Sequence, residues 1–226
     1  MEKTMTTKRA RIRGVIFDMD GVLVSSEDYM VYCAQTALAD YGVFPVKEDF
    51  EPFVGSGEDL FVGGVAEKYG VPYQIAMKER TYEIYIERAS EGVKLFTGIP
   101  QMFSELFGLG YKLGIASSAD EIKVRANIRV AGIPENTISA LLTGSHVKRK
   151  KPFPDIFLAS AEKLALDPSE CLVVEDAING IQAAKEAGMM SVGVLGSFTE
   201  EALRQAGADH VVANTSDIVA WLKRPL

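Results

Sequence analysis

Gly14-Val-Ile-Phe-Asp-Met-Asp-Gly21 is a short apolar run that ends in two aspartates and a glycine. Its β-branched and aromatic residues, followed by a turn-forming cluster, predict a buried strand over 14–17 that leads into a loop. In open α/β sheets, ligands bind beyond the carboxyl ends of the strands. Asp18 and Asp20 therefore stand where a binding or catalytic site would form.

The segment after this strand shows helical periodicity only. Apolar residues recur at helical spacing in three stretches, over 30–41, 60–69 and 75–86. Alternation of apolar and polar residues, the mark of a half-buried strand, is not convincing anywhere in it. We therefore expect a helical block over 26–95.

Beyond Leu95, predicted helices and strands alternate. The strands are short and almost continuously apolar, which is typical of a doubly wound, mostly parallel sheet with helices on both faces. The sequence thus predicts an α/β fold whose core is interrupted after its first strand. The expected helices cover 100–107, 121–131, 154–164, 177–187, 199–205 and 216–222, and the expected strands cover 113–116, 140–143, 171–174, 191–195 and 210–212.

The composition excludes several classes of protein. Apolar residues make up 47% of the 226 residues, which is too many for an intrinsically disordered chain. A formal net charge of −7 argues against nucleic acid as a partner. No apolar run approaches the roughly 18 residues that a membrane-spanning helix needs. The two cysteines, Cys33 and Cys171, make neither a disulfide framework nor a metal-binding spacing.

The first 13 residues are polar and basic and lack the apolar stretch of a secretory signal. We expect them to form a solvated N-terminal tail, with a transit peptide as the alternative. We also expect a cytoplasmic protein that is a monomer.

Polar side chains follow the later predicted strands too, at the points where these strands end. Because the carboxyl ends of parallel strands meet at one edge of a sheet, we expect these side chains to lie near Asp18 and Asp20. They are Ser117 and Ser118, Glu175 and Asp176, and Lys151 in the loop after the strand over 140–143.

Four carboxylates at one edge would repel one another and raise each other's pKa. A hard divalent cation relieves that repulsion, and Mg²⁺ takes a few carboxylate oxygens together with water and phosphate. Ser117 offers a hydrogen-bond donor and Lys151 a positive charge for phosphate oxygens. The set predicts a magnesium site for phosphoryl transfer, in which positioning and charge neutralisation provide most of the catalysis.

Each signal has a purely structural alternative when it is taken alone. The two aspartates suit a turn or a calcium loop, the serines suit a helix N-cap, and Glu175 with Asp176 suit the start of a helix. Lys151 ends the basic run 148–151 and could be a solvated loop charge. Their shared position at strand ends favours the site. We expect His146 and His210 to be loop and strand-edge residues rather than catalytic ones.

Four motifs stand in order along the chain: Phe17-Asp-Met-Asp-Gly-Val-Leu23, Ala116-Ser-Ser118, Lys151-Pro-Phe-Pro-Asp-Ile-Phe157 and Val174-Glu-Asp-Ala-Ile-Asn-Gly180. Over residues 14–222 the chain resembles the haloacid dehalogenase-like hydrolases, most of all the subgroup of β-phosphoglucomutases and small sugar-phosphate phosphatases. The resemblance implies a Rossmann-like core over 14–25 and 96–226, with an α-helical cap domain inserted over 26–95.

The resemblance also implies a mechanism. Asp18 would attack phosphorus and form an aspartyl phosphate, while Asp20 would protonate the leaving oxygen and later accept a proton from water. Ser117, Ser118 and Lys151 would hold the phosphoryl oxygens. Mg²⁺ would be held by Asp18, Asp176 and the backbone carbonyl of Asp20, with Glu175 in support.

Departures from the family pattern bear on the substrate. Glu58 stands where β-phosphoglucomutases carry an arginine for a second phosphate, and Ala119 and Glu121 replace residues that help to hold it. These losses favour a phosphatase of a small phosphorylated metabolite, a sugar phosphate by expectation, over a mutase. In the cap, Ser56, Gly57 and Glu58 are expected to contact the substrate.

Two further activities bear on the cap and the metal site. A phosphonatase would need a cap lysine for a Schiff base, and Lys47, Lys68 and Lys78 keep that alternative open. A dehalogenase would leave Asp20 and Asp176 without a role, and so it is disfavoured. One other departure, Lys150 in place of a usual glycine, has no functional explanation in the sequence.

Overall fold

The structure, a computed structural model, describes residues 12–54 and 57–224. The strand predicted over 14–17 is β1 (Gly14–Phe17), and all four of its residues are buried. It lies at the centre of a six-stranded sheet with the order β5-β4-β1-β6-β7-β8, in which every neighbouring pair is parallel. Phe17 pairs with Ile115 on one side and with Val174 on the other, so Asp18 leaves the sheet beside the ends of two other strands.

The other strands lie within one or two residues of their predicted positions. Their bounds are β4 (Lys112–Ala116), β5 (Ile138–Leu142), β6 (Cys171–Glu175), β7 (Met190–Val194) and β8 (His210–Val212). β1, β6 and β7 are buried along their whole length, because helices cover both faces of the sheet.

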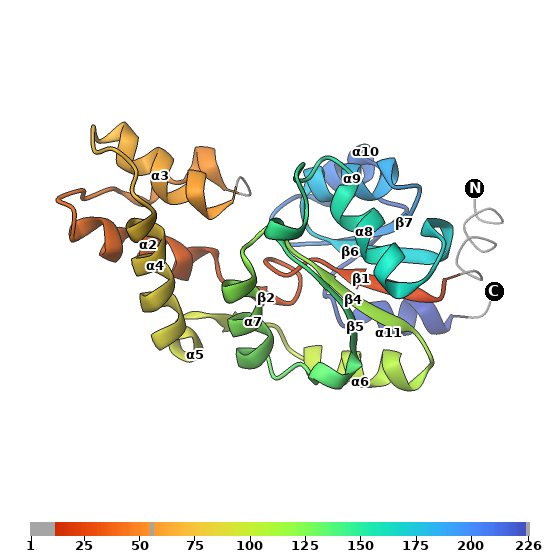
Figure 1. Cartoon of the computed structure of the whole chain (residues 1–226). Helices are drawn as coiled ribbons and strands as arrows, with labels where there is room; N and C mark the ends of the chain where they lie inside the picture. The colour runs from red at the N-terminus through yellow and green to blue at the C-terminus, as the bar shows by residue number, and fades with distance from the viewer. Residues whose placement is uncertain (1–11, 55–56, 225–226) are drawn as a thin grey trace.

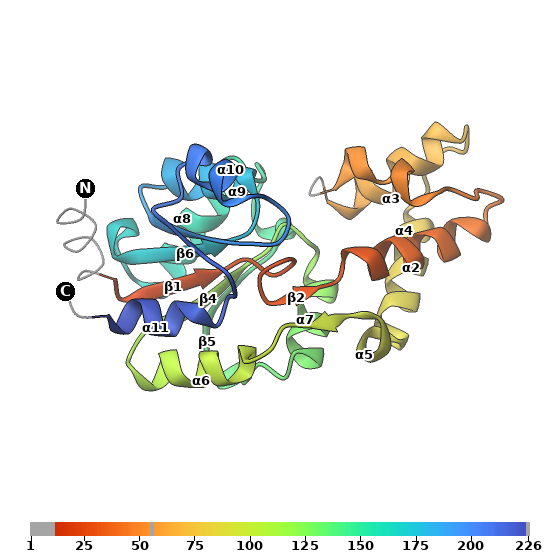
Figure 2. The ribbon, with the colours of Figure 1, turned by 180° about the vertical axis from the view of Figure 1, so that it is seen from behind.

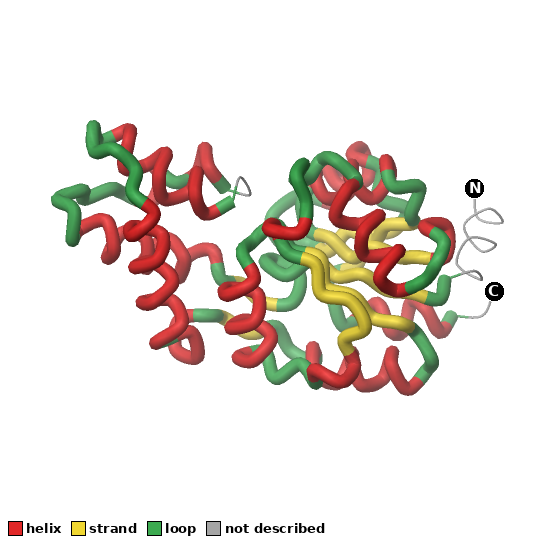
Figure 3. Tube along the Cα trace, viewed as in Figure 1, coloured by secondary structure: helices red, strands yellow, loops and turns green. Residues whose placement is uncertain are grey.

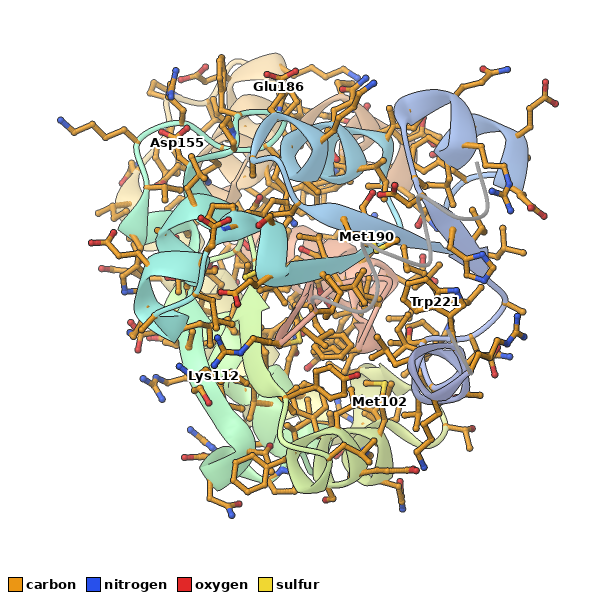
Figure 4. The ribbon with its side chains drawn as sticks, turned by 90° about the vertical axis from the view of Figure 1, so that its right-hand side faces the viewer. Met102, Lys112, Asp155, Glu186, Met190 and Trp221 are labelled. Carbon is orange, nitrogen blue, oxygen red and sulfur yellow. The ribbon has the colours of Figure 1, made fainter. Side chains whose placement is uncertain are left out.

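Side-chain alternation along β1 divides the core into two layers. Val15 and Phe17 pack on the face that is covered by α6 (Ile99–Gly108) and α11 (Asp217–Lys223), whereas Ile16 packs on the face that is covered by α8 (Asp155–Leu164) and α9 (Ile178–Glu186). Figure 4 shows this division: Met102 and Trp221 lie on one side of the sheet, and Asp155 and Glu186 lie on the other. The doubly wound α/β fold is confirmed.

The remaining helices of this part are α7 (Glu121–Val130), which follows β4, and α10 (Glu200–Ala206), which packs on α9. Three short 3-10 helices complete it. They are η3 (Glu135–Thr137), η4 (Gly144–His146) and η5 (Pro168–Glu170).

Between β1 and β4 the chain leaves the sheet and forms a separate group of helices, here called the helical segment (residues 27–92). Its members are α2 (Glu27–Ala39), η1 (Lys47–Asp49), η2 (Glu51–Phe53), α3 (Glu58–Lys68), α4 (Ile75–Glu87) and α5 (Ala89–Gly92). Figure 1 shows it beside the sheet, and Figure 2 shows the same separation from behind. In Figure 3 this part is drawn in helix and loop colours.

Two short strands join the helical segment to the sheet. β2 (Val24–Ser25) pairs antiparallel with β3 (Lys94–Leu95), so the chain leaves and re-enters at adjacent points. The sequence did not predict this pair, because two residues are too few to show alternation. The division into a core and a cap with these boundaries stays a proposal, which the paired strands support.

The helical segment has its own apolar packing. Tyr29 of α2 lies against Tyr85 of α4 with ring centroids 5.0 Å apart, and the Tyr29 hydroxyl donates to the carbonyl oxygens of Ile84 and Tyr85. Gly92 leaves room for the Tyr29 ring, since a Cβ there would lie 2.1 Å from a ring carbon. Within the described residues, no helix is long and apolar enough to cross a membrane.

Candidate active site

Asp18 follows the last residue of β1 and is almost fully buried. The Nζ of Lys151, in the loop before α8, lies 2.5 Å from Asp18 Oδ1 and 3.0 Å from Glu175 Oε1. Burial alone would lower the pKa of Lys151, but the carboxylates of Asp18 and Glu175 raise it, so the ammonium stays charged. The structure thus brings together three residues that are far apart in the sequence.

Asp176 completes a group of three buried carboxylates. One oxygen each of Asp18, Glu175 and Asp176 lies within 4.8 Å of the others. Ser197 Oγ donates to Asp176 Oδ2, and Glu175 Oε2 accepts the backbone N–H of Asp176 at 2.9 Å. Gly21 allows the loop after β1 to lie against Asp176, because a Cβ at this position, where φ is +82°, would lie 2.1 Å from Asp176 Oδ2.

Burial and mutual repulsion dominate the electrostatics of this group. Burial, and then the Glu175 carboxylate, raise the pKa of Asp18 to about 7 although Lys151 opposes the shift. Burial, and then Asp18, raise the pKa of Asp176 to about 7. Burial likewise raises the pKa of Glu175. One ammonium does not balance three carboxylates, and oxygen donors of this kind fit a hard divalent cation such as Mg²⁺.

Asp20 points to a different set of partners. Its Oδ1 accepts a hydrogen bond from Ser26 Oγ, and its Oδ2 lies 3.0 Å from Nζ of Lys123 on α7. The side chain of Lys123 is only 7% exposed. Burial alone would lower the pKa of Lys123, but Asp20 and Glu58 raise it. Asp20 is therefore paired with a buried cation other than Lys151.

Sequence reasoning missed Lys123. The sequence predicts the catalytic and metal-binding residues at strand ends and the substrate contacts in the cap, whereas Lys123 lies in α7. A weak signal is present, since Lys123 shares the buried face of α7 with Val124 and Asn127, where a lysine is unusual.

Both predicted serines lie at the end of β4. Ser117 is buried, and its Oγ accepts the backbone N–H of Ala119 at 3.1 Å. The carbonyl oxygen of Ser118 accepts a hydrogen bond from Lys150 Nζ at 3.3 Å. Lys150 thus supports the serine loop from the neighbouring loop, and its Nζ also lies where a Cβ of Gly57 would be.

These residues line one cavity of about 580 Å³ that lies between the sheet and the helical segment. All the predicted site residues of the sheet part line it: Asp18, Asp20, Ser117, Ser118, Lys151, Glu175 and Asp176. From the helical segment, Gly57 and Glu58 line it, whereas Ser56 lies outside the described residues.

Further residues that the sequence did not single out for the site also line the cavity. The helical segment adds apolar side chains and Glu27, α9 adds two polar side chains, and the loop after β7 adds a serine and a phenylalanine. They are Met30, Val31, Phe53, Val54 and Phe61, together with Asn179, Gln182, Ser197 and Phe198. Their part in the cavity depends on how the helical segment packs, which no local pattern predicts.

The three lysines considered for a phosphonatase and the two histidines do not line the described part of the cavity. Lys47 and Lys68 are ion-paired with Asp28 and Asp49 in the helical segment, and Lys78 with Asp59 and Asp120. None of these lysines is among the described residues that line the cavity. His146 bonds Thr143 through Nδ1, and His210 stacks on Trp221, both away from the lining.

Comparison with known proteins agrees with the geometry. The family model described as haloacid dehalogenase-like hydrolase matches residues 15–194. Beta-phosphoglucomutase of Bacillus subtilis is 31% identical over 222 residues, which cover 93% of each protein. Phosphoglycolate phosphatase of Yersinia pestis is 28% identical and covers 95% of this chain and 94% of its own length.

A third relative is much longer. Protein SUPPRESSOR OF QUENCHING 1, chloroplastic, of Arabidopsis thaliana is 40% identical over 202 residues, which are 87% of this chain but 19% of that protein. The chain therefore spans about a fifth of the length of that relative.

Solved structures share the fold. CbbY from Rhodobacter sphaeroides, in complex with phosphate, has a TM-score of 0.80 at 24% identity and covers 94% of this chain and all of its own. A putative beta-phosphoglucomutase from Thermotoga maritima has a TM-score of 0.76 at 28% identity and covers 95% of this chain and 100% of its own. The family match and the phosphatases among the relatives confirm the predicted enzyme class, a phosphoric monoester hydrolase. This chain belongs to the haloacid dehalogenase-like hydrolases.

Proposed function

We propose that the protein is a Mg²⁺-dependent phosphatase that hydrolyses a small phosphorylated metabolite, a sugar phosphate by preference, through a phosphorylated Asp18. The observation that carries the proposal is the Lys151 ammonium between Asp18 and Glu175 at the end of β1, with Asp176 beside them. Lys151 opposes the loss of charge that burial imposes on Asp18, and Asp18 lines a cavity that has room for a phosphate ester.

In the first step, an Asp18 carboxylate oxygen forms a bond to phosphorus while the bond from phosphorus to the ester oxygen breaks. Asp20 gives its proton to the departing oxygen, so the leaving group departs as an alcohol. In the second step, Asp20 takes a proton from water as that water attacks phosphorus. The Asp18–phosphorus bond then breaks and inorganic phosphate leaves.

The other residues hold charge and position. Lys151 and the two serines at the end of β4 bind the phosphoryl oxygens in this proposal. A Mg²⁺ ion bound by Asp18, Asp176 and the backbone carbonyl of Asp20, with Glu175 in support, would neutralise the negative charge of the phosphoryl group.

Hydrolysis of p-nitrophenyl phosphate by Asp18→Asn tests this function. With Mg²⁺ present, we expect kcat to fall by more than about 10³-fold, because an amide cannot act as the nucleophile. Asp40→Asn, at an exposed position on the end of α2, is the matched control and should keep full activity. EDTA should abolish the wild-type activity. Turnover by Asp18→Asn at the wild-type rate would refute the proposal.

β-Phosphoglucomutase activity is the second candidate, and the relative from Bacillus subtilis favours it. A mutase supplied with β-glucose 1-phosphate and catalytic glucose 1,6-bisphosphate forms glucose 6-phosphate, whereas a phosphatase releases free phosphate. We expect free phosphate. Conversion to glucose 6-phosphate without phosphate release would assign the mutase activity instead.

We also propose that the enzyme acts in the cytoplasm as a monomer. The relative whose name includes a chloroplast location makes the plastid the alternative compartment. We do not propose phosphonatase activity, which would need a lysine in the cavity for a Schiff base. The three candidate lysines are ion-paired with carboxylates and are not among the described lining residues.

A further inference from the structure

The cavity is acidic at both ends. Among the described lining residues there are six carboxylates but only two lysines, Lys123 and Lys151, and no arginine. Both lysines are already engaged, Lys151 with Asp18 and Glu175, and Lys123 with Asp20. Mg²⁺ would offset the excess charge at the phosphoryl end, whereas the described lining residues at the end that faces the helical segment include no further lysine or arginine.

Glu58 lies at that second end. It is the first residue of α3 and is only 7% exposed, and its Oε2 atom has no hydrogen-bond partner. An unpaired buried carboxylate oxygen is unfavourable unless a ligand satisfies it. Burial raises the pKa of Glu58, whereas the Lys123 ammonium lowers it and so favours the charged carboxylate.

Two further lysines lie near Gly57 and Glu58, and both have other partners. Lys150 Nζ lies against Gly57 and donates to the carbonyl oxygen of Ser118 at 3.3 Å. Nearby Asp120 accepts a hydrogen bond from the Tyr82 hydroxyl at 3.0 Å. Lys78 Nζ is ion-paired with both Asp120 and Asp59, so this lysine is already neutralised. If Lys123 turned toward a second anion, Asp20 would lose its partner. A carboxylate or a second phosphate on the substrate would therefore meet Glu58 with no unpaired lysine or arginine among the described lining residues.

We propose that Glu58 is a specificity-determining residue that accepts a hydrogen bond from a hydroxyl group on the leaving-group side of the substrate. The inference rests on the proposed phosphatase function and narrows its substrates to monophosphates of uncharged, hydroxyl-bearing alcohols. Phosphate esters that carry a carboxylate or a second phosphate on the leaving group are rejected by like-charge repulsion.

Two pairs of substrates that differ only at the far end test this selectivity. The short pair is 2-hydroxyethyl phosphate and phosphoglycolate, and the long pair is sorbitol 6-phosphate and 6-phosphogluconate. In each pair a hydroxymethyl group is replaced by a carboxylate. One of the two pairs should be long enough to place its far end beside Glu58. In that pair and with Mg²⁺ present, we expect the wild type to hydrolyse the ester with the hydroxymethyl group at least about tenfold better in kcat/KM than the ester with the carboxylate.

Glu58→Gln removes the charge and keeps the shape. The preference for the alcohol should fall to within about threefold in that same pair, because the repulsion of the carboxylate disappears. Glu67→Gln is the matched control: it makes the same change at an exposed position of α3 and should leave the preference as in the wild type.

The outcomes separate this inference from the function on which it rests. If p-nitrophenyl phosphate and both pairs are left intact in the presence of Mg²⁺, the phosphatase function itself is wrong. If esters are hydrolysed but the wild type prefers the carboxylates in both pairs, or shows no preference, the role of Glu58 is wrong. An unchanged preference in a folded Glu58→Gln enzyme would also overturn it.

Discussion

At the scale of single residues, the site is defined by buried negative charges that outnumber the buried positive ones. Asp18, Glu175 and Asp176 share one buried ammonium, Lys151, and burial raises the pKa of both Asp18 and Asp176 to about 7. Asp20 has a separate cation, Lys123. Each half of the proposed acid–nucleophile pair is thus held by its own lysine, which keeps the two aspartates in different environments.

The raised pKa values predict how Mg²⁺ should stabilise the fold. Between about pH 4 and 7 the folded, metal-free protein keeps protons on Asp18 and Asp176 that the unfolded chain has released, so its free energy of unfolding falls as the pH rises. Metal binding requires the deprotonated carboxylates. We therefore expect Mg²⁺ to raise Tm more at pH 7.5 than at pH 5.5.

Scanning calorimetry at the two pH values measures the difference. At a hundredfold excess over Kd, the gain at pH 7.5 should be about 2.7 kcal/mol, or roughly 5–10 °C in Tm. The protein in buffer with EDTA and no added Mg²⁺ provides the metal-free reference. Equal shifts at pH 5.5 and 7.5 would show that these carboxylates do not exchange protons for the metal.

At the scale of elements, the close contact of β6 with α9 positions the acidic pair. Glu175 ends β6, and Gly180 lies in the first turn of α9. A Cβ on Gly180 would lie 1.6 Å from Glu175 Oε1, the atom that contacts Lys151. The glycine therefore serves the placement of Glu175, although alanine would be the better helix former by about 1 kcal/mol.

Gly180→Ala should consequently lower activity. Displacement of Glu175 disturbs Lys151 and the metal-binding carboxylates, and we expect kcat/KM for p-nitrophenyl phosphate to fall by roughly 10–100-fold. Gly108→Ala is the matched control, since Gly108 ends α6 and a Cβ there would meet nothing within 4 Å. Full activity in Gly180→Ala would mean that the position of Glu175 is unimportant for catalysis.

At the scale of the whole molecule, the cavity exists because two bodies face one another. The sheet part contributes the carboxylates and Lys151, and the helical segment contributes Glu58 and apolar side chains. Within the described residues the chain passes between them at the paired strands β2 and β3 (Figure 1), which is a suitable place for a hinge. Closure would exclude water during the first step and opening would admit it for the second.

Closure of the helical segment onto the sheet part predicts a smaller radius of gyration. A compact chain of this length has a radius of gyration of about 17 Å, and the separated arrangement of Figure 1 should exceed that value. Small-angle X-ray scattering with Mg²⁺ and beryllium fluoride, a mimic of a phosphoryl group on an aspartate, should show a decrease toward it. Asp18→Ala, which lacks the acceptor, should show none. An unchanged radius in the wild type would argue against closure.

The sequence was sufficient for the α/β class and for placing the residues that end or directly follow β1, β4 and β6 beside one another, because the carboxyl ends of parallel strands meet at one edge of a sheet. It did not point to Ser197 after β7, which donates to Asp176. Lys123 and the unpaired oxygen of Glu58 could not be predicted in this way. Their environments depend on how α3, α4 and α7 pack across the cavity, and a single helix pattern contains no such information. The β2–β3 pair was missed because it is only two residues long.

The central claim, hydrolysis in two steps through a phosphorylated aspartate, can be tested at phosphorus itself. A phosphate ester made chiral with oxygen isotopes, hydrolysed by the wild type in isotopically labelled water, reports whether one or two in-line displacements occurred. Two displacements, by Asp18 and then by water, predict overall retention of configuration at phosphorus. Inversion would show that water attacks the substrate directly and would contradict the covalent intermediate.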